Sequence, residues 1–230
     1  MQGYNCPVCK NKGNVMVIQN GYEYMAECEC MEVRRAQWRL ESSGLADVAQ
    51  RYRFDTFRTE KKYQQTMKDM ALAFCEAGTG WFYIGGQAGS GKTHICTAIA
   101  NAFMEQGKAV RYMIWLDEVT RLKAMKTDEE GYAKEIMSWK RPQVLYIDDF
   151  FKTRNGAMPT DADVNTAFEL INARYNDKNL ITIFSGERTM QEVIDIDEAL
   201  GSRIYQRCGK YKLSIGRGRE KNYRLQEADR

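Results

Sequence analysis

The sequence predicts an α/β fold in which helices cover both faces of a parallel sheet, with a small cysteine-rich module ahead of it. Short apolar runs alternate with segments of helical periodicity from about residue 52 onward, and such alternation gives parallel, three-layered sheets. A glycine-rich loop joins the first of these runs to a helix, and four of the seven cysteines lie in the first thirty residues. At 230 residues the chain suits a domain of residues 51–230 preceded by a module of residues 1–50.

The strands and helices are expected from apolar runs and their spacing. Strands are expected at residues 81–84, 109–114, 144–147, 180–184 and 211–215. Helices are expected at residues 61–75, from residue 95 to a stop at Gly107, and at residues 163–175. A long charged helical region covers residues 116–140 and is predicted to break near Gly131.

The glycine-rich loop matches the pattern G-x-x-x-x-G-K-[ST] at every position, between a predicted strand and a predicted helix. In that context the backbone N–H groups of the loop and the helix N-terminus receive a phosphate chain. Lys92 then reaches the β- and γ-phosphates of ATP, and the Thr93 hydroxyl is a ligand for Mg²⁺. The predicted nucleotide-binding residues are Gly86, Gln87, Ala88, Gly89, Ser90, Gly91, Lys92, Thr93 and His94.

Two acids follow the predicted strand at residues 144–147. Ligands of parallel sheets bind outside the carboxyl ends of the strands, so Asp148 and Asp149 are expected to face the glycine-rich loop. Asp148 is predicted to hold Mg²⁺, and Asp149 to orient the attacking water. Ser185, at the end of the next strand, is predicted to sense the γ-phosphate or to hold the attacking water. His94 is the only histidine, which excludes a two-histidine metal site and argues against a Ser-His-Asp hydrolase; it is interpreted as structural.

The N-terminal cysteines have the spacing of a metal site. A C-x₂-C pair is followed, after eighteen residues, by C-x-C, and residues 15–19 and 22–26 between them are expected to form a hairpin around Asn20-Gly21. Thiolates clustered in this way favour a closed, tetrahedral, structural Zn²⁺ site over disulfides, with free thiols as the alternative. The predicted zinc ligands are Cys6, Cys9, Cys28 and Cys30.

Charge and hydropathy limit the kinds of partner that the sequence predicts. No apolar run approaches the roughly 18 residues that span a bilayer, so a cytoplasmic protein without a membrane partner is expected. From residue 201 onward there are nine Lys or Arg against three acidic residues, which suits either a polyanionic partner or a solvated tail. Residues 31–50 are predicted to be helical and basic, with Trp38 among arginines, as in a partner-binding helix or a linker.

Several motifs follow one another in a particular order. After Phe54-Asp55-Thr56-Phe57 come residues 86–93, 144–149 and 183–185, then Gly201-Ser202-Arg203-Ile204-Tyr205-Gln206-Arg207 and Asn222-Tyr223-Arg224. This order resembles AAA+ ATPases of the DnaC/DnaI helicase-loader group, to which IstB transposition helpers are also similar. The resemblance implies a P-loop NTPase fold without a full helical lid, since only about fifteen residues follow the fifth strand. It also implies weak, partner-dependent ATP hydrolysis.

The same resemblance implies partners and a further catalytic group. The N-terminal part would bind a hexameric replicative helicase, and the ATPase domain would grip single-stranded DNA and self-assemble into ATP-bridged oligomers. By position Arg207 matches the arginine finger, with Arg203 as the second candidate. The family often has Asn where this chain has Gly186, which leaves the sensor role to Ser185 alone.

DNA contacts and the choice of function stay open at this stage. Candidate contacts combine cations with aromatic rings; the alternative is a solvated helix face with core phenylalanines. Competing functions are an IstB-like transposition helper, a small-molecule P-loop kinase, and a non-hydrolysing zinc adaptor that holds ATP. The candidate DNA-contacting residues are Lys123, Lys126, Lys134, Lys140, Arg141 and residues 150–154.

Overall fold

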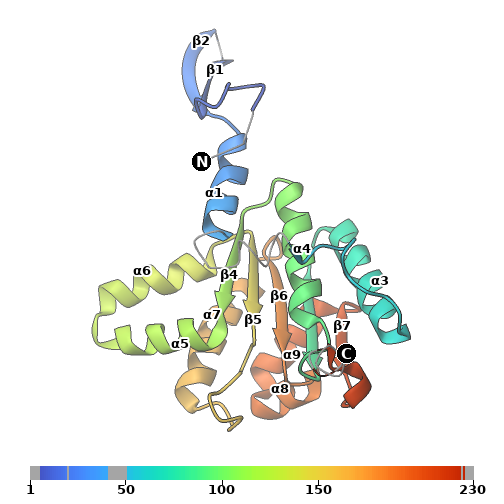
Figure 1. Cartoon of the computed structure of the whole chain (residues 1–230). Helices are drawn as coiled ribbons and strands as arrows, with labels where there is room; N and C mark the ends of the chain where they lie inside the picture. The colour runs from blue at the N-terminus through green and yellow to red at the C-terminus, as the bar shows by residue number, and fades with distance from the viewer. Residues whose placement is uncertain (1–5, 20, 41–50, 224, 226–230) are drawn as a thin grey trace.

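The computed structural model describes residues 6–19, 21–40, 51–223 and 225 (Figure 1). Its centre is a five-stranded sheet in the order β4-β5-β6-β3-β7, in which every pair of neighbours is parallel. All five strands were predicted from the sequence. Their bounds are β3 (Trp81–Gly86), β4 (Val110–Ile114), β5 (Val144–Asp148), β6 (Ile181–Gly186) and β7 (Lys212–Ile215).

Helices cover both faces of this sheet, which confirms the three-layered α/β fold. Side chains alternate between the two faces of a strand, so Phe82 and Ile84 enter one core and Trp81 and Tyr83 the other. The first core is shared with α3 (Lys62–Ala77) and α4 (Lys92–Glu105). The second is shared with α5 (Trp115–Ala124), α6 (Glu129–Lys140), α7 (Asp161–Tyr175), α8 (Met190–Ile196) and α9 (Glu198–Cys208).

The long helical region breaks at a different place from the one predicted. A short 3₁₀ turn, η2 (Met125–Thr127), separates α5 from α6, and Asp128 caps α6. Gly131 lies inside the first turn of α6, where its N–H donates to Asp128 Oδ1 at 3.0 Å. A Cβ at Gly131 would lie 2.1 Å from Asp128 Oδ2, so this glycine serves the cap and does not end the helix.

The N-terminal module projects from the sheet domain (Figure 1). The antiparallel strands β1 (Asn14–Gln19) and β2 (Tyr22–Glu27) form the predicted hairpin, with Gln19 opposite Tyr22. The helix α1 (Cys30–Leu40) follows and contacts β4 and α4. The predicted helix continued to residue 50, and its Ser42-Ser43-Gly44 break lies outside the described residues, as does Asn20.

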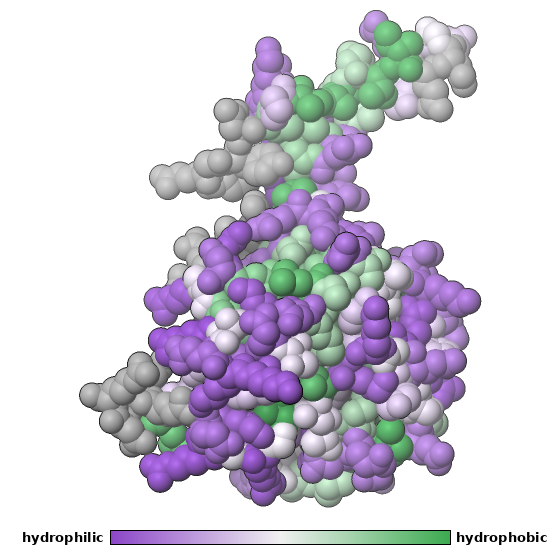
Figure 2. Space-filling view, turned by 90° about the vertical axis from the view of Figure 1, so that its right-hand side faces the viewer, coloured by the Kyte–Doolittle hydropathy of each residue, from purple (hydrophilic) through white to green (hydrophobic). Residues whose placement is uncertain are grey.

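The surface differs between the module and the domain. Figure 2 shows polar side chains over most of the visible face of the domain, with apolar side chains gathered on the projecting hairpin. On the hairpin, Met16, Ile18 and Met25 are 60%, 72% and 66% exposed. Among the described residues, no helix is both long enough and apolar enough to cross a membrane.

Candidate functional site

The phosphate loop lies where β3 passes into α4, at the carboxyl edge of the sheet. Gly86 has a φ of +110°, and a Cβ there would lie 2.1 Å from Ile215 O, so only glycine allows β7 to approach this closely. The loop borders a cavity of about 360 Å³. Residues from separate parts of the chain share this cavity with the loop: Tyr52, Phe57, Asp149, Lys152, Glu187 and Tyr223.

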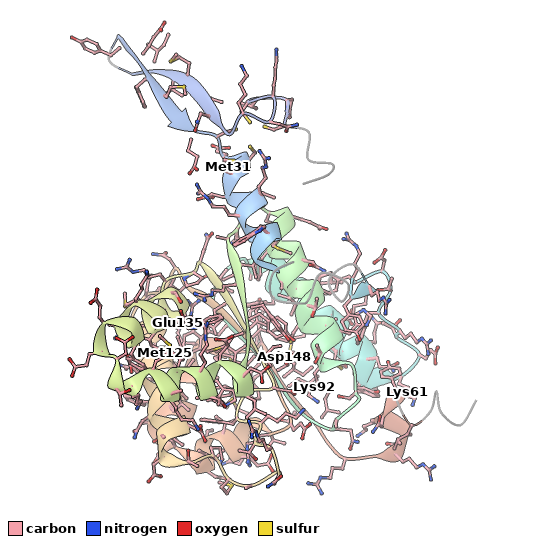
Figure 3. The ribbon with its side chains drawn as sticks, turned by 60° about the vertical axis from the view of Figure 1, so that its left-hand side comes forward. Met31, Lys61, Lys92, Met125, Glu135 and Asp148 are labelled. Atoms are coloured by element: carbon pink, nitrogen blue, oxygen red, sulfur yellow. The ribbon has the colours of Figure 1, made fainter. Side chains whose placement is uncertain are left out.

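Lys92 begins α4 and lies almost fully buried at 7% exposure. Its Nζ donates to Gly86 O at 3.0 Å and to Gln87 O at 2.7 Å. Desolvation lowers the pKa of Lys92, while the charges of Glu187 and Asp149 act in the opposite direction. Lys92 and Asp148 lie near each other at this edge of the sheet (Figure 3).

The Asp148 carboxylate is held by three hydroxyl groups. Tyr112 donates to its Oδ2 at 2.9 Å, Thr93 Oγ1 lies 3.3 Å from its Oδ1, and Ser185 also donates to Oδ1. Neighbouring oxygen ligands in a Mg²⁺ octahedron lie about 3 Å apart, so Thr93 and Asp148 fit a shared ion. Ser185 is 1% exposed and contacts the carboxylate directly. Tyr112 has no motif of its own and was missed from the sequence.

Asp149 turns out of the strand through a left-handed backbone, with φ at +54°. Its N–H donates to Asp148 Oδ1 at 3.0 Å. Its Oδ2 lies 2.8 Å from Lys152 Nζ, which also lies 3.4 Å from Glu187 Oε1. Lys152 was considered from the sequence only as a DNA contact, and Glu187 was not considered. A cation and two further acids thus share the cavity with the phosphate loop.

His94 lies in the first turn of α4 and packs against the segment that precedes α3. Its ring stacks on Tyr52, with centroids 4.5 Å apart, and its Nε2 lies 3.0 Å from Arg53 O. Desolvation lowers the pKa of His94, so the ring is neutral at pH 7. Its contacts are with protein groups, in keeping with a structural role beside the nucleotide cavity.

Arg203 and Arg207, the two candidates for the arginine finger, lie on α9. Arg207 donates to Asp177 O at 3.2 Å and Leu180 O at 3.1 Å, and its guanidinium lies 5.3 Å from the Trp81 ring centroid. Arg203 donates to Ala199 O at 2.6 Å. Trp81 begins β3 and Leu180 immediately precedes β6, so Arg207 lies at the amino ends of these strands, whereas the phosphate loop follows the carboxyl end of β3. Arg203 lies over the rings of Phe168 and Tyr175 on α7, away from that loop.

The aromatic part of the predicted DNA contact is wrong. Phe150 and Phe151 are 0% and 1% exposed, and both rings pack against Trp115 in the second core, out of reach of a base. Lys123 is paired with Asp163 at 2.6 Å and Lys140 with Glu169 at 2.6 Å. Lys126, Lys134 and Arg141 are exposed.

The four N-terminal cysteines form one buried cluster. Their Sγ atoms all lie within 4.8 Å of one another, with Cys6 and Cys28 at 3.8 Å and Cys9 and Cys30 at 3.4 Å. A tetrahedral zinc with Zn–S bonds of about 2.3 Å separates its ligands by about 3.8 Å, so the cluster fits the ion. The remaining cysteines, Cys75, Cys96 and Cys208, are buried and form no disulfides.

Together, the parallel sheet, the phosphate loop and the acids beside it define a P-loop ATP-binding protein. The chain belongs to the family of IstB-like ATP binding proteins, whose sequence profile matches residues 22–228. This confirms the resemblance predicted from the motif order.

The chain is similar to known proteins in sequence and in fold. The phage-like element PBSX protein XkdC of Bacillus subtilis (strain 168) is 34% identical over 97% of this chain and 87% of its own length. The structure of the DnaC helicase loader is similar with a TM-score of 0.59 and 19% identity, over 74% of this chain and 98% of that chain. The replication initiator DnaA bound to AMPPCP and single-stranded DNA has a TM-score of 0.57 and 18% identity, over 78% and 56%. This chain thus spans about half of DnaA, and at these identities both structures show a shared fold.

Proposed function

We propose that this protein is an ATP-dependent helicase loader that binds a replicative helicase through its N-terminal module and single-stranded DNA through its ATPase domain. The observation that carries the proposal is that one chain combines a cavity lined by the phosphate loop and Asp149 with a projecting hairpin that has exposed apolar side chains and a neighbouring cluster of four cysteines. The similar fold of the DnaC helicase loader supports it. Residues 1–50 and 51–230 would then be two functional units.

We assign the chemistry of ATP hydrolysis to the residues around the phosphate loop. Lys92 would neutralise the β- and γ-phosphates, and Thr93 and Asp148 would hold Mg²⁺, which supplies charge stabilisation to the phosphoryl group. Asp149 would orient the attacking water. Ser185, which donates to Asp148, would keep that carboxylate aimed at the ion.

The arginine finger would come from a neighbouring copy of the chain, since Arg203 and Arg207 lie far from their own phosphate loop. We favour Arg203, which donates to one backbone carbonyl of its own helix. Arg207 donates to the carbonyls of three residues that lead into β6 (Asp177, Lys178 and Leu180), so its removal would disturb the sheet edge as well. ATP bound between copies would couple hydrolysis to assembly.

The N-terminal module would carry the partner site. In the proposed loader, Zn²⁺ bound by the four cysteines would hold the hairpin rigid. Met16 and Met25 are paired across the hairpin, and Ile18 lies on the same face. Exposed apolar side chains gathered on one element mark interaction sites in soluble proteins. Single-stranded DNA would meet the exposed cations Lys126, Lys134 and Arg141.

A binding assay with the full chain tests the partner. The Ile18→Asp, Met25→Asp double variant should lose helicase binding, whereas Leu72→Asp, an acid at an exposed apolar position on α3, should retain it. ATP turnover is measured in parallel with and without single-stranded DNA. Helicase that does not bind the wild-type chain would refute the loader, and turnover absent under every condition would leave a non-hydrolysing adaptor.

A second candidate function is that of an IstB-like transposition helper. The family profile over residues 22–228 favours it specifically. The ATP site would be the same, and only the partner would differ. The same binding assay with a transposase in place of the helicase distinguishes the two functions.

A further inference from the structure

The segment that follows β7 lies alongside the phosphate loop. We call residues 216–223 the C-terminal strap. β7 pairs with β3 in parallel as far as Ile215 opposite Gly86, where the phosphate loop begins. Beyond this pair the phosphate loop and the strap leave the sheet side by side. Most of the strap is drawn in red beyond β7 in Figure 1, beside α3 and the start of α4.

Hydrogen bonds tie the strap, and the last residue of β7 before it, to the phosphate loop. Gln87 N–H donates to Ile215 O at 3.1 Å, and Gly218 N–H donates to Gln87 Oε1 at 3.2 Å. At the far end, Tyr223 N–H donates to Gly89 O at 2.9 Å. The strap therefore satisfies acceptors of the same loop whose N–H groups would receive phosphate.

Two loop glycines are shaped for the strap as well as for phosphate. Gly89 has a φ of +72°, and a Cβ there would lie 2.1 Å from Asn222 Oδ1. A Cβ on Gly91 would lie 3.1 Å from Phe57 Cε2 and 3.5 Å from Tyr223 Cε2. Side chains from both ends of the ATPase domain thus close around the loop.

The strap is held on its other side by the start of α3. Lys61 Nζ, near the strap in Figure 3, donates to Glu220 O, and Gln64 Nε2 donates to the Tyr223 hydroxyl. Gln64 is 1% exposed, and its Oε1 accepts from Lys61 N–H at 2.6 Å. That second hydrogen bond fixes which way the Gln64 amide points, so the donor to Tyr223 is built in.

We propose that the strap is a working part of the nucleotide site, with Tyr223 as a positioning residue that holds Gly89 and Gly91 in the conformation that receives phosphate. The Tyr223 ring also borders the nucleotide cavity. The Asn222-Tyr223 pair thereby takes a role in ATP binding that its place near the end of the sequence does not indicate. This inference deepens the ATP site of the proposed function and is independent of the partner.

Coupling between strap and nucleotide works in both directions. If the strap stabilises the loop conformation that binds ATP, then ATP must stabilise the strap by the same free energy. Loosening the strap weakens ATP binding, and binding ATP slows amide exchange at Gly218 and Tyr223. Hydrolysis of bound ATP is less affected, because the strap bonds described above go to the phosphate loop and the start of α3, whereas Asp148 is held by Tyr112, Thr93 and Ser185.

Direct ATP binding to the full-length chain tests the inference. Tyr223→Ala should weaken ATP affinity about ten-fold or more, since it loses the ring against Gly91 and the hydrogen bond from Gln64. Tyr223→Phe keeps the ring and should lose about three-fold. In turnover assays Tyr223→Ala should raise KM and leave kcat within a few-fold. Tyr22→Ala, an exposed hairpin tyrosine, is the matched control and should bind ATP like the wild type.

Hydrogen exchange on the wild-type chain is the second measurement and needs no variant. ATP should slow exchange across residues 216–223. Wild-type ATP affinity in a folded Tyr223→Ala protein would overturn the inference, and so would exchange of the strap that ATP leaves unchanged. If Tyr223→Ala fails to fold, the exchange result decides alone. Failure of either leaves the helicase test untouched, because that test reads partner binding.

Discussion

In the sheet domain two hydrophobic cores lie on either side of the five-stranded sheet, whereas in the N-terminal module the buried cluster is four cysteines with Val15 and Met31 beside them. The domain buries whole aromatic side chains such as Trp81 and Trp115. The hairpin of the module instead exposes most of its apolar side chains. We expect the domain to be stable through burial, and we propose that the module depends on a metal ion bound by its four cysteines.

This difference separates two tasks. Burial fixes the phosphate loop, Asp148 and the strap relative to one another, which phosphate chemistry requires. If zinc bound by four thiolates stabilises the module, its apolar side chains need not form a core and can lie on the surface. The helix α1, which contacts β4 and α4, connects the regions. The comparison predicts that damage to one region leaves the other working.

The largest effect is expected from loss of a cysteine. Cys28→Ser should abolish stoichiometric zinc binding and unfold the hairpin, because structural zinc contributes about 10 kcal/mol or more to folding of such modules. Elemental analysis and circular dichroism measure this. One zinc per chain retained by Cys28→Ser would break the comparison, since the module would then not depend on its four thiolates.

The next largest effect concerns the arginine from a neighbouring copy. Arg203→Ala should keep ATP affinity within a few-fold and lose about 10³-fold in turnover. Mixing it with Asp149→Asn should restore part of the activity, because each variant supplies what the other lacks at a shared interface. Arg207→Ala is the companion variant, and we expect it also to lower thermal stability. Turnover per chain that does not change with protein concentration would contradict assembly.

The acids and the lysine at the cavity separate binding from hydrolysis. Asp149→Asn should spare ATP binding and reduce turnover by about 10²-fold or more. Lys92→Ala should abolish ATP binding, because it removes the cation nearest the loop. Both are measured by direct binding and single-turnover hydrolysis, with zinc content as the control. Normal turnover in Asp149→Asn would remove this acid from the mechanism.

The smallest effect is expected on the hairpin surface. Ile18→Ser should change the free energy of unfolding of the chain by no more than about 0.5 kcal/mol, since Ile18 is 72% exposed. The same change should weaken helicase binding measurably. Thermal melts and a binding titration on one sample compare the two. A large loss of stability would show that Ile18 serves the fold rather than a partner.

Local sequence patterns predicted most of the architecture, because the strands, the phosphate loop and the hairpin each have a signal within a short stretch of adjacent residues. The helices α8 and α9 were not assigned as elements, since short helices between strands carry little periodicity. Phe150 and Phe151 were predicted as candidate DNA contacts. Their burial against Trp115 was not foreseen, because it depends on a contact between residues distant in sequence. Tyr112 and Glu187 were missed for the same reason, and no local signal marks them. Tyr223 belongs to the closing Asn222-Tyr223-Arg224 motif, but the motif alone does not place its ring against the phosphate loop.

We propose that the nucleotide site and the partner site are physically separate, and chelation of the metal tests this most directly. Zinc is removed from the wild-type chain with a chelator, and ATP affinity and helicase binding are then measured on the same sample. The account predicts ATP affinity unchanged within a few-fold, with helicase binding lost and restored when zinc is returned. ATP binding lost together with the metal, or helicase binding that survives its removal, would contradict the account.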